Sequence, residues 1–443
     1  MIKGIVGLQF GDEGKGKATD YFAEEFNNIV RFSGGINAGH TVCVNNQTYK
    51  FSQLPAVVHD RKNLFLSHAV LIEPETLLKE IKILNDFKDI KLFIDPRAHL
   101  VLPIHPLLNQ ASESYKGSKR IGSVGKGIGA CYEDKINRVG VRIADIFDED
   151  ALLDKINFLY TLRSKQINHV FGIKYDDVKK NIEQTCEALF EFSQQIKKYI
   201  SYVNEEIEIR LKYKQNFLLE GSQATFLDNG LGSYPYTVAY PTLMTSCFYN
   251  MGIPVQNNFH VIGVMKAYTI RVGEGPFPTE LFDENADLLR KTGNEYGTVS
   301  GRMRRCGWLD LNIIKHAIEL NGVDEIMITN IDVLSVLEKF YVCYQYEKDK
   351  RLVKSNEACF DLTAVKPIYK EFESWDFNID EISQGKLPKK LIEFISYIED
   401  FLEVPITTLS YGKDRKHTLR IVNIRHNSSY YVWPDKNIQE LAL

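Results

Sequence analysis

The segment Gln9-Phe10-Gly11-Asp12-Glu13-Gly14-Lys15-Gly16-Lys17 decides the interpretation of this chain. It follows the apolar run Ile2 to Leu8, which predicts a buried strand, and precedes Ala18 to Phe22, which can open a helix. A strand, a glycine-rich turn and a helix N-terminus make a phosphate site, because backbone N–H groups converge and the helix end adds partial positive charge. Gly14, Lys15, Gly16 and Lys17 are therefore predicted to bind a nucleotide.

The turn departs from the standard P-loop, which reads G-x-x-x-x-G-K-[ST]. Gln9 stands at the first glycine position, and Gly16 stands where Ser or Thr would hold magnesium. Asp12 lies inside the turn. Phosphate anions repel a neighbouring carboxylate unless the carboxylate binds a metal ion or accepts a proton. Asp12 is therefore a candidate for chemistry. From this segment alone, a structural turn with two solvated lysines remains an alternative.

A second glycine-rich loop, Gly34-Gly35-Ile36-Asn37-Ala38-Gly39-His40-Thr41, follows the strand-like run Ile29 to Phe32. It carries one histidine, the usual general acid near neutral pH. A lone histidine is more often structural. Its position in a glycine-rich loop close to a phosphate loop favours a catalytic role for His40.

Composition excludes several classes of protein. The 443 residues are 44% hydrophobic and 25% charged, which is typical of a globular protein with a large core. The formal net charge of −4 argues against a nucleic-acid partner. No apolar run approaches the ~20 residues that span a bilayer, so no membrane partner is expected. Seven scattered cysteines without metal-type spacing predict reduced thiols and a cytoplasmic location.

Short apolar runs separated by helical patterns predict an α/β fold with a mostly parallel, twisted sheet covered by helices. The expected strands include Leu64 to Leu66, Lys91 to Ile94, Asn216 to Leu219, His260 to Met265, Glu325 to Thr329, Phe340 to Tyr344 and Val404 to Leu409. We expect one large domain over residues 1–443, with a mostly helical insertion at 150–215 and an amphipathic helix at 388–402. A C-terminal extension at 420–443 would add a strand or cover a dimer interface.

Further motifs follow in order along most of the chain, and together they resemble the adenylosuccinate synthetase family. Besides the two glycine-rich loops, the matching segments are Gly125-Lys126-Gly127-Ile128-Gly129, Tyr132-Glu133-Asp134-Lys135, Glu220-Gly221-Ser222-Gln223, Lys266 to Gly273, Gly275 to Glu280, Gly297 to Arg302, Arg304 to Trp308 and Asp414-Arg415. The resemblance implies a P-loop-NTPase-like fold.

The resemblance also implies a reaction. The family joins L-aspartate to the 6-position of IMP in purine nucleotide biosynthesis, using GTP and Mg²⁺, through a 6-phosphoryl intermediate. Asp12 matches the base that takes the N1 proton, and its carboxylate would hold Mg²⁺ together with the backbone carbonyl of Gly39. His40 matches the acid on the phosphoryl side. Thr41 matches a further nucleotide-binding position.

Two segments match the walls of the guanine pocket, with one departure in each. The family has T-K-x-D where this chain reads Thr329-Asn330-Ile331-Asp332, and Asp332 matches the residue that accepts the guanine N–H groups. The family has S-x-G-P-D-R where this chain reads Ser410 to Arg415, with Ser410 and Gly412 matched and Lys413 in place of Pro. Either the two walls have exchanged their lysine, or the choice between GTP and ATP is relaxed.

The remaining matched residues imply how the other substrates bind. Thr298, Ser300 and Arg302 match aspartate-binding positions, Arg302 also reaches the acceptor, and Arg304 reaches both aspartate and the nucleotide. Asn37, Gln223, Val272 and Arg138 match positions that contact the IMP-like acceptor, as does Asp12. The residue matched by Arg138 comes from the neighbouring subunit, which implies a homodimer with shared active sites.

The acceptor pocket departs from the family at two places. The pattern G-T-T-G-[RK]-G reads Gly122 to Gly127, with Val124 for a threonine, and Y-P-[FY]-V-T-S-S-N reads Tyr234 to Pro241, with Val238 for a threonine. Both threonines help to hold the IMP 5′-phosphate, and a hydrogen bond to a charged group is worth about 1.5–3 kcal/mol. One interpretation is drift within an ordinary synthetase; the other is a paralogue whose 6-oxopurine acceptor lacks the 5′-phosphate or carries something else there.

A protein of another class, a nucleotide-binding sensor without catalysis, is a further alternative. It is disfavoured because Asp12, Lys15, His40 and Arg302 are all present.

Overall fold

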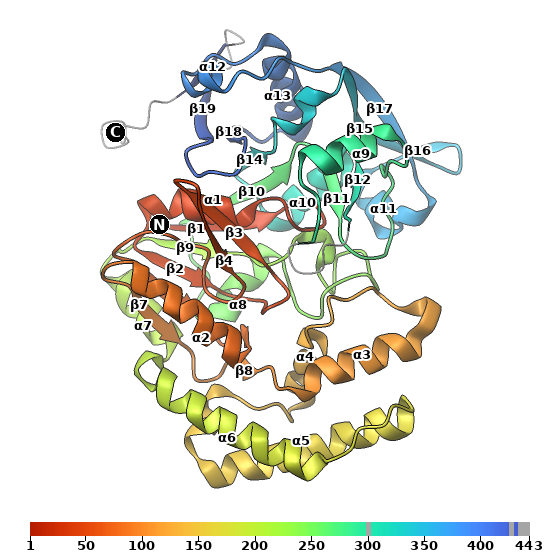
Figure 1. The fold of residues 1–443 in the computed structure, drawn as a ribbon. Helices are drawn as coiled ribbons and strands as arrows, with labels where there is room; N and C mark the ends of the chain where they lie inside the picture. The colour runs from red at the N-terminus through yellow and green to blue at the C-terminus, as the bar shows by residue number, and fades with distance from the viewer. Residues whose placement is uncertain (298–302, 425–428, 433–443) are drawn as a thin grey trace.

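A ten-stranded sheet forms the centre of the molecule (Figure 1). The computed structural model describes residues 1–297, 303–424 and 429–432. Strands lie in the order β20-β19-β18-β14-β10-β1-β9-β2-β5-β7, and every pairing from β18 to β7 is parallel. The parallel strands are β18 (Ile406–Ser410), β14 (Glu325–Thr329), β10 (Phe259–Lys266), β1 (Ile2–Gly7), β9 (Phe217–Glu220), β2 (Asn28–Arg31), β5 (Asn63–Leu66) and β7 (Lys91–Ile94). The prediction of a mostly parallel sheet is confirmed.

Helices cover both faces of this sheet, which explains the nearly continuous apolar runs of its strands. In β9 and β14, for example, every residue is buried. The main helices are α1 (Lys15–Phe22), α2 (Pro74–Ile83), α3 (Ile104–Lys116), α4 (Ile128–Asn137), α5 (Glu149–Lys165), α6 (Val178–Ile196), α7 (Val203–Lys212), α8 (Cys247–Met251), α9 (Glu284–Thr292), α10 (Leu311–Asn321) and α13 (Lys389–Leu402). No helix in the described ranges is long and apolar enough to cross a membrane.

The run Phe340 to Tyr344 is a strand, as expected, but it lies outside the main sheet. It belongs to β15 (Lys339–Lys348), which pairs antiparallel with β16 (Arg351–Val353) and β17 (Lys366–Glu373), and parallel with β13 (Leu309–Asp310). Asp349 and Lys350 connect β15 to β16, both with positive φ, as in the tight turns of antiparallel hairpins. Apolar periodicity alone did not predict this turn.

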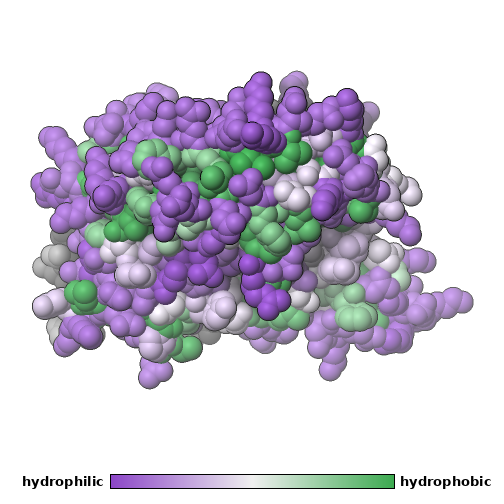
Figure 2. Space-filling view, turned by 90° about the horizontal axis from the view of Figure 1, so that it is seen from below, coloured by the Kyte–Doolittle hydropathy of each residue, from purple (hydrophilic) through white to green (hydrophobic). Residues whose placement is uncertain are grey.

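Helices α5, α6 and α7 occupy the region where an insertion was expected, and α5 and α6 lie at the bottom of Figure 1. Seen from that end, the surface is mostly hydrophilic, with hydrophobic patches between the charged side chains (Figure 2). Arg163 on α5 donates to the buried Asp134 on α4 at 2.8 Å, and His105 on α3 contacts the other Asp134 oxygen at 2.9 Å. This buried cluster joins the helical segment to the main body.

The chain after Leu409 adds two strands to one edge of the sheet. β19 (Thr418–Ile424) pairs antiparallel with β18, and β20 (Ser429–Val432) pairs antiparallel with β19. Strand addition was one of the two roles expected for the segment from residue 420. Residues 425–428 and 433–443 of that segment lie outside the described residues.

Candidate active site

The carboxyl ends of the parallel strands meet at one edge of the sheet, where α/β proteins place their ligand sites. The glycine-rich loop follows β1, and Asn37 and His40 lie on the segment after β2. Glu220 ends β9, Lys266 ends β10, and Asp332 and Ser410 belong to β14 and β18 or the turns after them. The topology therefore brings together segments that are up to 400 residues apart.

The glycine-rich loop adopts a conformation that few residues can take. Gly11, Asp12 and Gly14 have φ angles of 96°, 59° and 94°, all in the left-handed region. The buried Glu13 carboxylate fixes the turn by accepting the N–H groups of Gln9 at 3.2 Å and Gly11 at 2.7 Å. Helix α1 begins at Lys15, earlier than the Ala18 start expected from sequence, because the glycines belong to its first turn.

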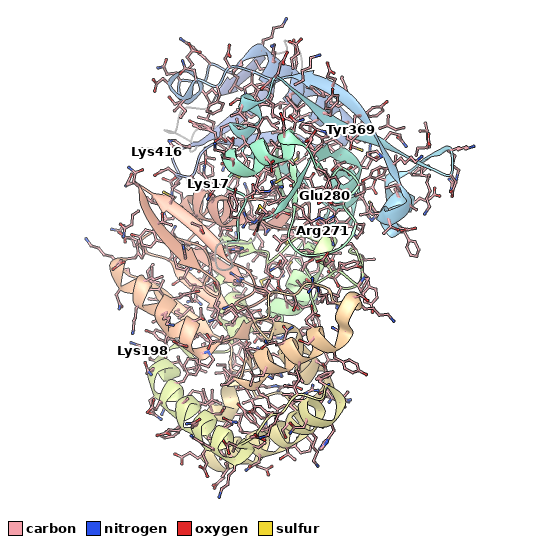
Figure 3. All side chains as sticks on the ribbon, turned by 45° about the vertical axis from the view of Figure 1, so that its right-hand side comes forward. Lys17, Lys198, Arg271, Glu280, Tyr369 and Lys416 are labelled. Carbon is pink, nitrogen blue, oxygen red and sulfur yellow. The ribbon has the colours of Figure 1, made fainter. Side chains whose placement is uncertain are left out.

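The two lysines of the loop have different partners. Lys15 Nζ lies 2.6 Å from Glu13 Oε2 within the loop. Lys17 Nζ donates to the carbonyls of Tyr411 at 3.2 Å and His417 at 2.9 Å, so it ties α1 to the segment after β18 (Figure 3). Burial lowers the pKa of Lys17 to about 7, although the nearby Asp332 and Asp414 oppose the shift. Lys15 is therefore the better placed of the two for a terminal phosphate.

His40 begins β3 (His40–Val44) and packs directly against the first turn of α1. A Cβ on Gly16 would lie 2.8 Å from His40 Cβ, so a Ser or Thr has no room at this position. The steric contact explains why this chain lacks the hydroxyl of a standard P-loop.

A buried carboxylate fixes the His40 ring. His40 Nδ1 contacts Glu220 Oε1, and Glu220 Oε2 accepts the N–H of Ala56 at 2.9 Å. Burial lowers the pKa of His40, which Glu220 only partly opposes. With Nδ1 held by Glu220, the other ring nitrogen is left for a substrate. Sequence reasoning did not assign Glu220, although it lies in a matched segment directly after a buried strand.

Asp12 forms an ion pair with Arg304, which follows the undescribed residues 298–302. Arg304 Nη2 lies 2.7 Å from Asp12 Oδ2, and Arg304 Nη1 lies 2.9 Å from Glu295 Oε2. The structure therefore unites two residues that the sequence predicted for one site. It also adds Glu295, which sequence reasoning missed and whose only signal is its position two residues before Gly297. Thr298, Ser300 and Arg302 lie outside the described residues.

Asp332 lies just after β14 and is half-buried, with its Oδ1 atom shielded from solvent. Its Oδ1 has no hydrogen-bond partner in the described part of the chain, and burial raises the pKa of Asp332. Such an oxygen fits the N–H donors of a purine base. The turn after β18 lies against this residue: Ser410 is buried, Gly412 has a φ of 59°, and Lys413 is exposed. The arrangement fits the predicted base pocket.

At the acceptor end of the site, Asn37 is held by two neighbours. Gln223 Nε2 donates to the Asn37 carbonyl at 3.1 Å. The buried Tyr240 hydroxyl lies 3.1 Å from Asn37 Nδ2 and 3.2 Å from Asn37 Oδ1. Sequence reasoning missed Tyr240, although it stands where the quoted family pattern has a serine. This phenol fills space that a serine would leave open.

The two valines have different surroundings. Val238 is half-buried against the cluster of Leu71, Ile128 and Tyr240. Val124 is 59% exposed. The loop that carries Val124, residues 122–127, is held against α3, because Glu113 accepts the N–H groups of Gly122 and Ser123 at 3.0 and 3.2 Å.

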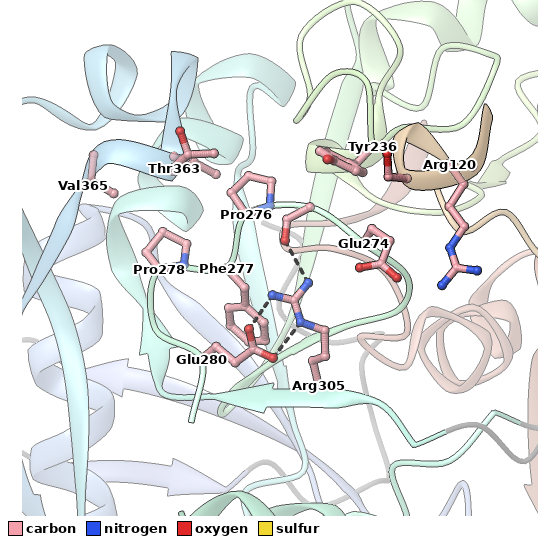
Figure 4. Close-up of a pocket in the computed structure, with 14 residues that line it drawn as sticks. Arg120, Tyr236, Glu274, Pro276, Phe277, Pro278, Glu280, Arg305, Thr363 and Val365 are labelled. Atoms are coloured by element: carbon pink, nitrogen blue, oxygen red, sulfur yellow. Dashed lines mark hydrogen bonds and ion pairs between the residues drawn. The ribbon is translucent and has the colours of Figure 1, made fainter. Parts of the chain in front are cut away.

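The other predicted residues lie nearer the surface. Val272 follows β11 (Thr269–Arg271) and is exposed, as are Gly39 and Thr41. Beside Val272, a cavity of about 700 Å³ is lined by Arg120, Tyr236, Glu274 and the Arg305–Glu280 pair (Figure 4). Asp12, His40 and Asp332 are not among the residues that line it. Arg138 caps the end of α4 and is exposed.

The proposed metal ligands fit magnesium better than a metal held by protein alone. The described residues contain no group of three or more His, Cys, Asp or Glu side chains placed to hold an ion. Mg²⁺ is usually bound by one or two carboxylates, with phosphates and waters completing its shell. Asp12, which is 36% exposed, and the backbone of the exposed Gly39 fit that requirement.

Comparison with known proteins identifies the family. The sequence model of the adenylosuccinate synthetase family matches residues 4–419. The chain belongs to the adenylosuccinate synthetase family. It is 52% identical to adenylosuccinate synthetase 1 of Photorhabdus laumondii, over 95% of this chain and 99% of that protein. It is 38% identical to adenylosuccinate synthetase of Thermoplasma volcanium, over 94% of this chain and 96% of that protein.

Solved structures place the fold in the same family. Fully ligated adenylosuccinate synthetase from Plasmodium falciparum superposes with a TM-score of 0.85 at 30% identity, covering 94% of this chain and 98% of that one. Succinoaminodeoxyadenylate synthetase of cyanophage S-2L, bound to dGMP and dATP, shares the fold with a TM-score of 0.58 at 20% identity, covering 95% of each chain. The P-loop-NTPase-like fold is thereby confirmed.

Family membership settles the type of activity. The chain is a C–N ligase that joins aspartate to IMP in purine biosynthesis, with GTP as co-substrate and Mg²⁺ as cofactor. This result overturns the alternative of a sensor without catalysis. The roles of individual residues follow from the geometry and are proposed below.

Proposed function

We propose that Asp12 and His40 carry the two proton-linked roles in this ligation. Their support is the convergence of both residues with Asp332 at the carboxyl edge of the sheet, where Asp12 and His40 flank the first turn of α1. Asp12 takes the N1 proton of the 6-oxopurine, so that O6 becomes nucleophilic. O6 then bonds to the γ-phosphorus of GTP, the bond from that phosphorus to the β–γ bridging oxygen breaks, and GDP leaves.

The second step replaces phosphate by an amine. The aspartate amine attacks C6 and gives up a proton to solvent, the C6–O6 bond breaks, and inorganic phosphate leaves with O6. Lys15, the N–H groups of Gly14 and Gly16, and His40 stabilise charge on the transferred group. Mg²⁺, when bound at Asp12 and Gly39, neutralises phosphate charge. Thr298, Ser300 and Arg302 bind the aspartate carboxylates in this proposal.

The test is product formation from IMP, aspartate and GTP, read by mass, with Asp12→Asn as the deciding variant. This substitution preserves size but removes both the base and the metal ligand, so turnover should nearly vanish while the thermal midpoint stays close to that of the parent. Asp60→Asn, a surface aspartate that caps the Lys88 N–H, is the matched control. Near-normal kcat in Asp12→Asn would overturn the assignment.

We also propose a homodimer in which Arg138 enters the partner's acceptor site. Arg138 and the neighbouring Ile136 are both exposed at the end of α4, and an apolar side chain beside an arginine suits an interface. Mixing inactive Asp12→Asn subunits with inactive Arg138→Leu subunits should restore part of the activity through hybrid dimers. A fully active monomer in sedimentation would contradict the proposal.

A second candidate acceptor is supported by one observation at the 5′ end of the pocket. Tyr240 engages the Asn37 carboxamide, and Val238 beside it cannot donate a hydrogen bond. These side chains would allow a 6-oxopurine without a plain 5′-monophosphate to be accepted beside IMP. Comparing kcat/KM for IMP, GMP, their deoxy forms and the nucleosides, each with GTP or ATP, decides between the acceptors and between the nucleotides.

We place the enzyme in the cytoplasm. All seven cysteines are free thiols, which is consistent with a reducing compartment. Expression of a tagged copy followed by fractionation tests the location.

A further inference from the structure

A chain of four alternating charges runs from β10 to the proposed catalytic base. Lys266 Nζ lies 2.6 Å from Glu295 Oε1, Arg304 Nη1 lies 2.9 Å from Glu295 Oε2, and Arg304 Nη2 lies 2.7 Å from Asp12 Oδ2. The order Lys266⁺, Glu295⁻, Arg304⁺, Asp12⁻ leaves no net charge. Its inner end at Lys266 is 5% exposed, Glu295 beside it is fully buried, and its outer end at Asp12 is 36% exposed.

Glu295 is the most tightly held of these four charged side chains. Its side chain is enclosed by Lys266 and by Tyr268, whose hydroxyl also contacts Oε1. The backbone repeats the link to Arg304, because the Arg304 N–H donates to the Glu295 carbonyl at 3.0 Å. A residue held from both sides by β10 and the turn after it has little freedom to move.

Arg304 has few other partners that could orient it. Among the described residues its Nε is buried without a hydrogen bond, and its guanidinium ion pairs are with Glu295 and Asp12. An arginine side chain has many rotamers, so a guanidinium that must meet a reacting group gains from being held in advance. Glu295 supplies that restraint, and Lys266 supplies the charge that makes a buried Glu295 tolerable.

We propose that Glu295 is a positioning residue that holds Arg304 against Asp12. The inference rests on the role proposed for Asp12 and on the match of Arg304 to a substrate-contacting position of the family, and it adds the residue that fixes their geometry. Glu295 does not touch substrate; it acts through Arg304. The competing interpretation is that Glu295 only neutralises the buried Lys266, with no effect on Arg304.

A double-mutant cycle on kcat/KM tests the proposal. Arg304→Ala and Glu295→Gln should each lower kcat/KM for aspartate, Glu295→Gln by roughly 10- to 100-fold as expected for a misplaced catalytic contact. In both variants the loss of kcat/KM should be divided between kcat and KM in the same proportion. The double variant should be no worse than Arg304→Ala alone, because Glu295 acts through Arg304. Additive losses would overturn the proposal.

Two further variants separate positioning from folding. Tyr268→Phe removes one contact to Glu295 but leaves the Arg304 pair, and it should keep kcat/KM within about threefold of the parent. In Glu295→Gln alone, the buried Lys266 ammonium loses its carboxylate partner. The double variant Glu295→Gln with Lys266→Met removes that ammonium, so the experiment can still be interpreted if Glu295→Gln alone fails to fold. Activity restored in that double variant would show that Glu295 only neutralises Lys266, and would overturn the proposal.

The outcomes also distinguish this inference from the proposed function. Normal activity in Arg304→Ala would remove the role assigned to Arg304 itself. Impaired Arg304→Ala together with normal Glu295→Gln would leave that role intact and overturn only the positioning by Glu295.

Discussion

The nucleotide end and the acceptor end of the site are built differently. At the nucleotide end, Lys15 and Lys17 are buried with named partners, and the loop conformation is fixed by Glu13. At the acceptor end, Val124 is exposed and its loop is bound to Glu113 on α3. Phosphate chemistry depends on backbone N–H groups at fixed positions, whereas acceptor recognition depends on side chains from distant segments. Substitutions at the acceptor end can therefore change the substrate without changing the fold.

Among the substitutions that compare the two ends, the largest effect is expected at the nucleotide end, from His40→Asn. Loss of a general acid usually costs about 10²- to 10⁴-fold in kcat, and Glu220 would lose its contact with the imidazole ring. Steady-state kinetics measure the loss, and the thermal midpoint checks that the fold survives. His316→Asn on α10 is the matched control, expected to stay near the parent. A His40→Asn enzyme within threefold of the parent would assign the catalysis to other groups.

A smaller effect is expected from Asp332→Asn. An amide replaces one acceptor oxygen by a donor that faces the guanine N–H groups, and a hydrogen bond to a charged group is worth about 1.5–3 kcal/mol. KM for GTP should rise roughly 10- to 100-fold while KM for ATP changes little. Asp376→Asn, an exposed aspartate outside the site, is the control. Equal changes for both nucleotides would mean that Asp332 does not read the base.

The same contrast explains what the sequence could predict. The glycine-rich turn between β1 and α1 could be predicted, because it needs local φ angles that few residues adopt, at Gly11, Asp12 and Gly14. The strands of the parallel sheet followed from their apolar runs. Glu220, Tyr240 and Glu295 were not assigned, because their roles arise from contacts to residues 180, 203 and 9 positions away. Such contacts leave no local pattern.

Helix and sheet boundaries show the same limit. The close packing of Gly16 in α1 against His40 depends on the position of β3. Likewise, the placement of β15 in a second sheet depends on the turn at Asp349 and Lys350. Both features require tertiary contacts or turn geometry that hydrophobic periodicity does not contain.

At the acceptor end, Val124→Thr with Val238→Thr tests whether the lost hydroxyls matter for IMP. If both positions serve the 5′-phosphate, KM for IMP should fall at least tenfold, since one recovered charged hydrogen bond is worth over about 1.4 kcal/mol. Val255→Thr, a similarly exposed valine elsewhere, is the control. A micromolar KM for IMP in the parent that the double change leaves unaltered would identify an ordinary synthetase.

The smallest effect is expected from Tyr240→Phe, which tests whether Tyr240 favours or disfavours binding of a 5′-phosphate. The substitution keeps the buried ring and removes only the hydroxyl that engages the Asn37 carboxamide. A neutral hydrogen bond is worth about 0.5–1.5 kcal/mol, so the change in KM should be roughly 2- to 10-fold. If Tyr240 withholds Asn37 from a phosphate, KM for IMP falls, whereas KM for the corresponding nucleoside stays constant.

The direction in which KM for IMP changes decides between the two roles of Tyr240, and a variant with a comparable loss of thermal stability is the control. Tyr160→Phe removes another buried hydroxyl, 2.7 Å from Thr185 in the helical segment, and should lower the thermal midpoint comparably without affecting KM. A higher KM for IMP in Tyr240→Phe would show that the phenol instead orients Asn37 for the phosphate. The acceptor end would then be as well preorganised for IMP as the nucleotide end is for GTP.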